Sequence, residues 1–262
     1  MQLSLPHLLP WQWTLAYLGA FCVGLSKTGI AGVGIVAVAL FSLFLPAKEA
    51  TGSVLLVLIS ADIIAVLSYR RDADWSKLIR LFPWTIAGVV FGAFAMRRVD
   101  DHGMRLLIGS ILLAIVLFQI VQRIRLRGKK DDPKPPSPAF APIAGLLAGF
   151  TTMVANAAGP IMTLYLLAMR LPKVAFIGTA AWYFFLMNVF KVPFSIYAGA
   201  MPSSAPLFAL ALFPGALVGG LIGRKILHRI DQKTFENIAI AFTLISAVYL
   251  IFRSLPSGAL NH

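Results

Sequence analysis

Residues 25–34 read Leu25-Ser26-Lys27-Thr28-Gly29-Ile30-Ala31-Gly32-Val33-Gly34, and they interrupt an apolar run that extends from Trp13 to Leu45. As one helix that run would be about 50 Å long, whereas the hydrocarbon core of a bilayer is only ~30 Å thick. A lysine at membrane depth is expensive and usually faces a protein interior or a water-filled cavity, and glycine permits tight turns. The sequence therefore predicts two shorter apolar segments, over 12–28 and 30–45, that meet at a polar break.

The composition indicates an all-α polytopic membrane protein. The chain is 59% hydrophobic and 13% charged, whereas a soluble domain is typically about a quarter charged. Its apolar segments are long enough to predict about eight to ten membrane segments. Beyond the first two, we expect them at residues 51–69, 81–96 and 104–122, and then at 140–155, 159–171, 174–198, 205–223 and 235–252.

A charged and proline-rich stretch divides the chain. Residues 123–138 combine arginine, lysine and aspartate with four prolines, which predicts an extended cytoplasmic linker outside the membrane. We therefore expect an N-terminal transmembrane repeat over 1–122 and a C-terminal transmembrane repeat over 139–262.

The second half repeats the plan of the first. At one constant offset Gly19 matches Gly145, Ser26 matches Thr152, Pro46 matches Pro172 and Asp62 matches Asn188. A second polar break, Asn156-Ala157-Ala158-Gly159-Pro160, follows the first at nearly this offset. The sequence predicts two repeats, each with a broken helix or a re-entrant hairpin followed by three transmembrane helices. Because each half has an odd number of segments, the repeats would be inverted; whether the first two segments cross or re-enter stays open.

The charge distribution predicts the topology. The net charge is +13, and the loops that share one face carry most of the 23 lysines and arginines. The positive-inside rule places that face in the cytoplasm and both termini outside. Nucleic-acid binding is not expected, because no basic cluster is interleaved with aromatic residues in a soluble domain.

The two breaks predict an anion site. Helix starts after each break present unpaired N–H groups and a partial positive charge, and a lysine adds a full charge. The residues expected to bind substrate are Ser26, Lys27, Thr28, Gly29, Thr152, Asn156 and Gly159. In the alternative interpretation, Lys27 extends to the headgroups and the hydroxyls bond to their own backbone.

Three further polar residues fall inside apolar segments: Asp62, Asn188 and Lys191. Asp62 is a candidate proton-coupling residue, or the partner of a lysine while the site is empty. The alternative is a permanent structural ion pair. No metal site or cofactor is expected, because the four histidines lack ligand spacing. Without a P-loop or a nucleophile–base pair, we do not expect an enzyme.

The Gly-rich opening from Gly24 to Gly34, its degenerate copy from Ala148 to Pro160 and the four-plus-four hydrophobic profile across the linker resemble the TauE/SafE sulfite exporter family. The resemblance covers about residues 12–252. It implies a transporter of the bacterial cytoplasmic membrane, linked to sulfite, sulfoacetate or other small organosulfur anions. No substrate-binding residue is carried over from the family.

The residues and the resemblance together predict a secondary transporter that exports a small sulfur-containing oxyanion by alternating access, with protons as the candidate coupling ion. Two alternatives stay open: a passive anion channel, and a membrane assembly or biogenesis partner without transport. The anion, the direction, the coupling ion and the oligomeric state are not fixed by the sequence.

Overall fold

The computed structural model describes Pro6 and residues 8–31, 33–45, 47–98, 137–156 and 158–239, together with Ala241 and Ile245. Within these ranges the chain is helical and has no strand. The expected segment 104–122, most of the linker 123–138 and the end of the segment 235–252 lie outside the described residues. The repeat bounds 1–122 and 139–262 therefore stay a prediction.

The described helices follow the same order in both halves. The first half contains α1 (Pro10–Thr28), α2 (Gly34–Ser42), α3 (Ala47–Tyr69) and α4 (Trp75–Arg98). The second contains α6 (Phe140–Ala155), α7 (Gly159–Ala168), α8 (Lys173–Tyr197) and α9 (Ala205–Arg229). Each half therefore begins with a helix that is interrupted at its predicted polar break, and two longer helices follow.

Both interrupted segments are helical hairpins. A Cβ atom built on Gly34 would lie 3.2 Å from Ser26 Oγ, and one built on Gly19 would lie 2.9 Å from the Phe41 ring, so α2 runs back along α1. In the second half the rings of Phe140 and Tyr165 stack with centroids 5.8 Å apart, which brings α7 back along α6. At nine and ten residues, α2 and α7 are about 14–15 Å long and too short to cross a bilayer core.

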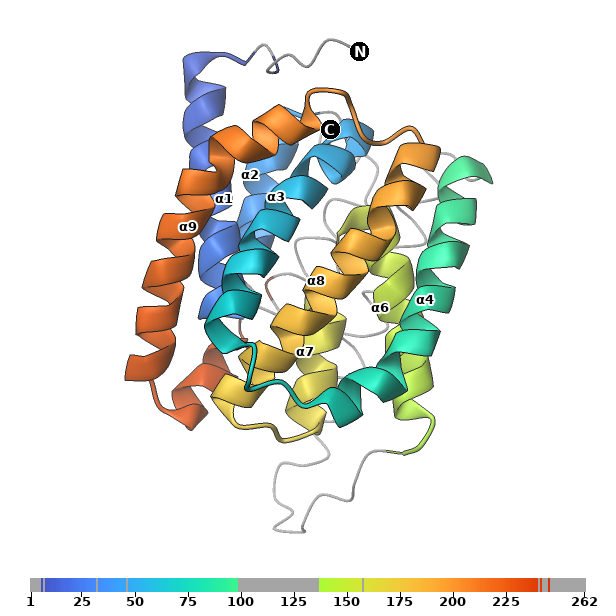
Figure 1. The fold of residues 1–262 in the computed structure, drawn as a ribbon, viewed down its shortest axis with the longest axis vertical. Coiled ribbons are helices and arrows are strands. Elements are labelled where there is room, and N and C mark those ends of the chain that lie inside the picture. Colours follow the sequence, from blue (N-terminus) through green and yellow to red (C-terminus); the bar gives the residue numbers. More distant parts are fainter. Residues whose placement is uncertain are drawn as a thin grey trace, which may run out of the picture.

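The helices form two bundles, each around its own hydrophobic core, and each bundle includes one helix from the other half of the chain (Figure 1). The first bundle contains α1, α2, α3 and α9, and its core includes Ala16, Phe41 and Phe208. The second bundle contains α4, α6, α7 and α8, which supply most of another core that includes Leu81 and Tyr183. We call the contact between α3 and α8, which joins the bundles, the seam.

Glycines allow the exchanged helices to pack backbone against backbone. A Cβ atom on Gly219 of α9 would lie 2.0 Å from the Phe21 carbonyl oxygen of α1. One on Gly88 of α4 would lie 2.2 Å from the Leu146 carbonyl oxygen of α6. These glycines have no side chain to hold the helices apart, as small residues do in membrane helix pairs.

The helix bounds differ from the sequence prediction where charged residues lie at helix ends. The predicted segment 81–96 was too short, because α4 already begins at Trp75. The buried Leu78 and Leu81 alternate with the exposed Ile79 and Arg80, so an amphipathic first turn precedes the apolar span. For the same reason α9 continues to Arg229, beyond the predicted end at 223.

The start of α4 is capped by a carboxylate. Ser76 donates both its backbone N–H (3.0 Å) and its hydroxyl (2.7 Å) to Asp74 Oδ1. The hydrogen bond from the Ser76 hydroxyl is the main cause that holds the pKa of Asp74 below its usual range. Asp74 therefore supplies the acceptor that the first turn of a helix lacks.

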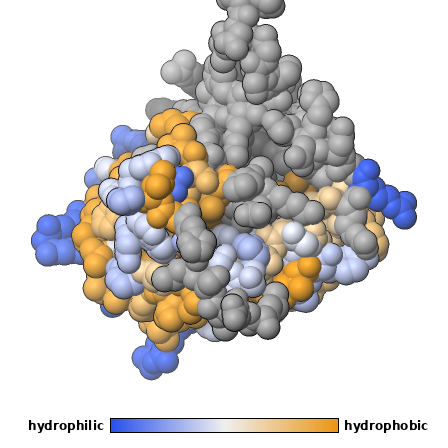
Figure 2. All heavy atoms as spheres, turned by 90° about the horizontal axis from the view of Figure 1, so that it is seen from above, coloured by the Kyte–Doolittle hydropathy of each residue, from blue (hydrophilic) through white to orange (hydrophobic). Residues whose placement is uncertain are grey.

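The outside of the described part is apolar. Four helical stretches are long and apolar enough to cross a membrane: Gly52–Tyr69, Trp75–Met96, Lys173–Tyr197 and Ala205–Arg229. Large hydrophobic side chains on them are exposed, including Leu67 (68%), Phe91 (63%) and Leu210 (69%). Hydrophobic residues make up much of the outline seen from above (Figure 2). These surfaces fit the acyl chains of a bilayer, and the chain is a multi-pass membrane protein.

Candidate functional site

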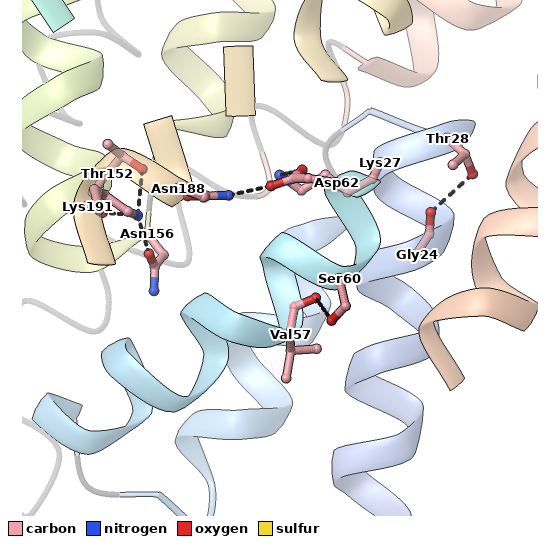
Figure 3. A network of polar contacts seen from close by, with 10 residues as sticks. All are labelled: Gly24, Lys27, Thr28, Val57, Ser60, Asp62, Thr152, Asn156, Asn188 and Lys191. Carbon is pink, nitrogen blue, oxygen red and sulfur yellow. Dashed lines mark hydrogen bonds and ion pairs between the residues drawn. The ribbon is translucent and has the colours of Figure 1, made fainter. Parts of the chain in front are cut away.

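A polar network occupies the centre of the molecule, where the end of α1, the middle of α3 and α8 and the end of α6 meet (Figure 3). It consists of two groups of contacts that α8 places one helical turn apart: Lys27, Asp62 and Asn188 form one, and Thr152, Asn156 and Lys191 form the other. All six were singled out from the sequence. The seam runs through this network, because α1 and α3 belong to the first bundle whereas α6 and α8 belong to the second.

Lys27 lies in the last turn of α1, directly before the break. Its Nζ atom is 2.8 Å from Asp62 Oδ1, and its side chain is 11% exposed. The contact is an ion pair. The same Nζ lies 3.8 Å from the centroid of the Phe184 ring of α8, a distance at which a cation is attracted to the ring face.

Asp62 is fully buried in α3 and contacts both bundles. Its Oδ1 atom faces Lys27, and its Oδ2 atom accepts a hydrogen bond of 2.6 Å from Asn188 Nδ2. The two residues predicted to match between the repeats therefore meet each other across the seam. A buried carboxylate requires such partners, because an unpaired buried charge is strongly destabilising.

Lys191 lies one helical turn after Asn188 in α8 and is 1% exposed. Its Nζ atom donates to the Thr152 carbonyl oxygen (2.9 Å), to Thr152 Oγ1 (3.1 Å) and to Asn156 Oδ1 (2.6 Å). Three oxygen acceptors match the three protons of an ammonium group. Lys191 therefore lies among neutral oxygens, whereas Lys27 lies against a carboxylate.

The turn of the second hairpin positions these acceptors. Asn156 ends α6 in the left-handed region with φ 52°, a conformation that asparagine tolerates better than most residues. The start of α7 is fixed by Pro160 in its first turn, as the sequence predicted. Among the described residues, a Cβ atom added to the neighbouring Gly159 would meet no atom within 4 Å, so this helix start borders open space in the described part.

The remaining predicted site residues lie beside the network. The Thr28 hydroxyl is directed away from it (Figure 3) and donates to the Gly220 carbonyl oxygen of α9 at 2.7 Å. Gly29 also packs on α9, because a Cβ atom there would lie 2.2 Å from the Gly223 carbonyl oxygen. Ser26 is half-buried and faces Gly34 within the first hairpin.

The sequence prediction missed Phe184. Helical spacing could have identified Phe184. It lies four residues before Asn188 and seven before Lys191, so all three share one face of α8. Among the described residues, no group of three or more His, Cys, Asp or Glu side chains could hold a metal ion.

In a comparison with protein families, the chain matches the model described as sulfite exporter TauE/SafE over residues 16–250. The chain belongs to the TauE/SafE family. The match includes both hairpins and every residue of the network, so the interpretation of the sequence as a resemblance to this family is confirmed. No curated protein and no solved structure matches this TauE/SafE chain. The TauE/SafE family is described as one of sulfite exporters. It is therefore a family of membrane transporters of an anion rather than of enzymes.

Proposed function

We propose that the chain is a secondary transporter that exports a small sulfur-containing oxyanion, such as sulfite or sulfoacetate, across the bacterial inner membrane. The observation that carries this proposal is the presence of two lysines, Lys27 and Lys191, in one buried network between two bundles. Buried lysines in a membrane protein are rare and mark ion or substrate pathways.

The network supplies the contacts that an oxyanion requires. Lys27 and Lys191 provide ammonium donors, Ser26, Thr152 and Asn156 provide polar groups near the hairpin turns, and the start of α7 at Gly159 provides N–H groups beside open space. Charge-assisted hydrogen bonds to an oxyanion are stronger than those between neutral groups. The carboxylate of Asp62 stands against Lys27 in the place that substrate oxygen atoms would take.

Alternating access would follow from movement of the bundles at the seam. Across the network, the described contacts between bundles include the Asp62–Asn188 hydrogen bond and the cation–π contact of Lys27 with Phe184. Substrate that binds between the bundles can replace these contacts and so favour a different bundle arrangement.

The directions of the helices support inverted repeats. In Figure 1, α3 runs from the top to the bottom of the molecule, whereas its counterpart α8 runs from the bottom to the top. Both α7 and α9 end at the bottom of Figure 1, and basic residues lie in the last turn of α9 (Arg229) and shortly after α7 (Arg170), so we assign this side to the cytoplasm. Both termini would then be external. As a separate part of the proposal, protons are the coupling ion and Asp62 is the group that carries them.

The test is sulfite and sulfoacetate counterflow in proteoliposomes, with Lys27→Met and Lys191→Met beside the wild type. We expect saturable exchange in the wild type and at least a tenfold loss of rate in each variant. Lys225→Met is the matched control, because Lys225 is an exposed lysine at the end of α9, and its exchange rate should equal that of the wild type.

The same assay separates the alternatives. A passive channel would conduct without counterflow or saturation. An assembly partner would show no flux, and its cellular role would survive in Lys27→Met. Wild-type protein that is folded and monodisperse but exchanges no sulfur oxyanion would contradict the proposal.

A further inference from the structure

We infer that the site accepts one net negative charge, and that Asp62 sets this valence. A monoanion such as bisulfite or a sulfonate would bind as it is, and a dianion would bind together with a proton on Asp62. The inference rests on the proposed transport function and specifies the substrate class of that site.

The first step is the balance of charged side chains. Among the described residues, the charged groups of the network are Lys27, Lys191 and Asp62, and the carboxylate is paired with Lys27. Two ammonium groups and one carboxylate leave one positive charge without an anionic partner. Uncompensated charge is expensive in a low-dielectric interior, so one added negative charge matches the form of the network in which both lysines are protonated and Asp62 is ionised.

The second step is the contrast between the two lysines. Lys27 has a carboxylate at 2.8 Å, whereas each acceptor of Lys191 is a carbonyl, hydroxyl or amide oxygen. Neutral oxygens solvate an ammonium group without neutralising it. The uncompensated charge therefore lies on the Lys191 side of the seam, about the hairpin turn whose Gly159 borders open space.

The third step is the asymmetry of the repeat pair. Asp62 and Asn188 lie at matching positions and meet through a hydrogen bond of 2.6 Å. An aspartate at both positions would cancel the charge of both lysines and leave nothing to attract an anion. Aspartate and asparagine side chains have nearly the same shape, so the two positions differ chiefly in charge. The single carboxylate of the pair therefore determines the charge of the site.

This arrangement predicts how protonation changes selectivity. When Asp62 is ionised, the site has one net positive charge. When Asp62 is protonated, it has two. Sulfite exists near neutral pH as both a monoanion and a dianion, so the site would export either form at the same net charge. One charge at a separation of a few Å in a protein interior is sufficient to change relative affinity tenfold or more.

The experiment uses two probes whose charge is fixed at neutral pH: methanesulfonate as the monoanion and sulfate as the dianion. Binding to purified protein and counterflow in proteoliposomes are measured for the wild type, Asp62→Asn, Asn188→Asp and the exchanged pair Asp62→Asn with Asn188→Asp. Size-exclusion chromatography checks that each variant is folded.

We expect Asp62→Asn to change the affinity ratio at least tenfold in favour of sulfate, and Asn188→Asp to lose affinity for both anions. The exchanged pair restores one carboxylate and should regain the wild-type preference for methanesulfonate. If one of the single variants does not fold, recovery of the methanesulfonate preference in the exchanged pair still tests the inference.

Two results separate failure of the valence inference from failure of the proposed function. If the wild type exchanges sulfite but the methanesulfonate-to-sulfate ratio is unchanged in Asp62→Asn, or if the exchanged pair does not regain the wild-type ratio, the valence inference is overturned and transport stands. If the wild type neither binds nor exchanges any of the three anions, both are overturned.

Discussion

Lys27 and Thr28 are neighbours in the chain but face opposite environments. Consecutive residues of an α-helix are separated by about 100° around its axis, so one side chain reaches the central network while the other meets α9. The sequence identified the break and its polar residues. It could not assign each polar residue to the network or to a helix contact, because that depends on which neighbour lies at each face.

Thr28→Val should separate these roles. Valine keeps the shape of threonine but removes the hydroxyl that donates to the Gly220 carbonyl oxygen. We expect a loss of about 1 kcal/mol in the free energy of unfolding, measured by thermal unfolding in detergent, with sulfite affinity unchanged. A large loss of sulfite affinity in folded Thr28→Val protein would instead return Thr28 to the substrate site.

Helix contacts explain why the first helix of each half is tied to a helix of the other half. Gly219 lies against the backbone of α1, and Gly88 lies against the backbone of α6. Glycines recur every four residues in α4 and in α9, and this spacing favours close helix packing. The partners could not be predicted, because a small-residue stripe specifies how closely a helix approaches its neighbour and not which neighbour that is.

Gly219→Ala should force α9 away from α1. A Cβ atom there would lie 2.0 Å from the Phe21 carbonyl oxygen, and overpacking of this kind costs about 1–3 kcal/mol. We expect a clear fall in the thermal unfolding temperature. Gly159→Ala is the stability control, because a Cβ atom at Gly159 meets nothing within 4 Å; equal destabilisation of both variants would argue against this packing.

Asp74→Ala should weaken the start of α4 in a pH-dependent way. Loss of a carboxylate cap typically costs about 1 kcal/mol. Because the pKa of Asp74 is held below its usual range by Ser76, the contribution is present above the unfolded-state pKa of about 4 and is lost as pH falls through the lower folded-state pKa. The difference in unfolding temperature between wild type and Asp74→Ala should therefore shrink as the pH falls below about 4.

Asp74→Asn provides the matched comparison for that series. Asparagine can also cap a helix but does not titrate. The difference in unfolding temperature between Asp74→Asn and Asp74→Ala should stay constant over the same pH range. If this difference shrinks at low pH as the difference between wild type and Asp74→Ala does, the titrating group lies elsewhere.

At the scale of the whole molecule, the two bundles do not coincide with the two halves of the sequence. The all-helical class, the order of the helices and the central position of the polar residues were predictable from hydropathy and repeat spacing. The exchange of α4 and α9 between bundles was not, since it depends on contacts between residues far apart in the chain, such as Thr28 and Gly220.

Two cross-links can identify which bodies move. A Cβ atom on Gly215 would lie 3.5 Å from Ala20 Cβ, a separation suited to a disulfide. In a Cys22→Ala background, Ala20→Cys with Gly215→Cys would tie α1 to α9 within the first bundle, although these helices come from different halves. We expect this disulfide to leave sulfite counterflow unchanged.

The second cross-link tests the seam. Val66 of α3 and Ala181 of α8 pack in one small hydrophobic cluster between the bundles. Cysteines at both positions, joined by a bifunctional thiol reagent, should block counterflow, and cleavage of the reagent should restore it. Inhibition by the first cross-link with none by the second would show that the sequence halves, and not the bundles, move as units.

The exchange of helices also bears on how the protein is made. As the first half leaves the ribosome, α1 and α4 are complete, but the helices that cover their glycine faces, α9 and α6, have not been synthesised. Neither bundle can close around its core until the chain has passed the connection between the halves. A gene cut at that connection would yield two polypeptides that must find each other in the membrane before either could hold its shape.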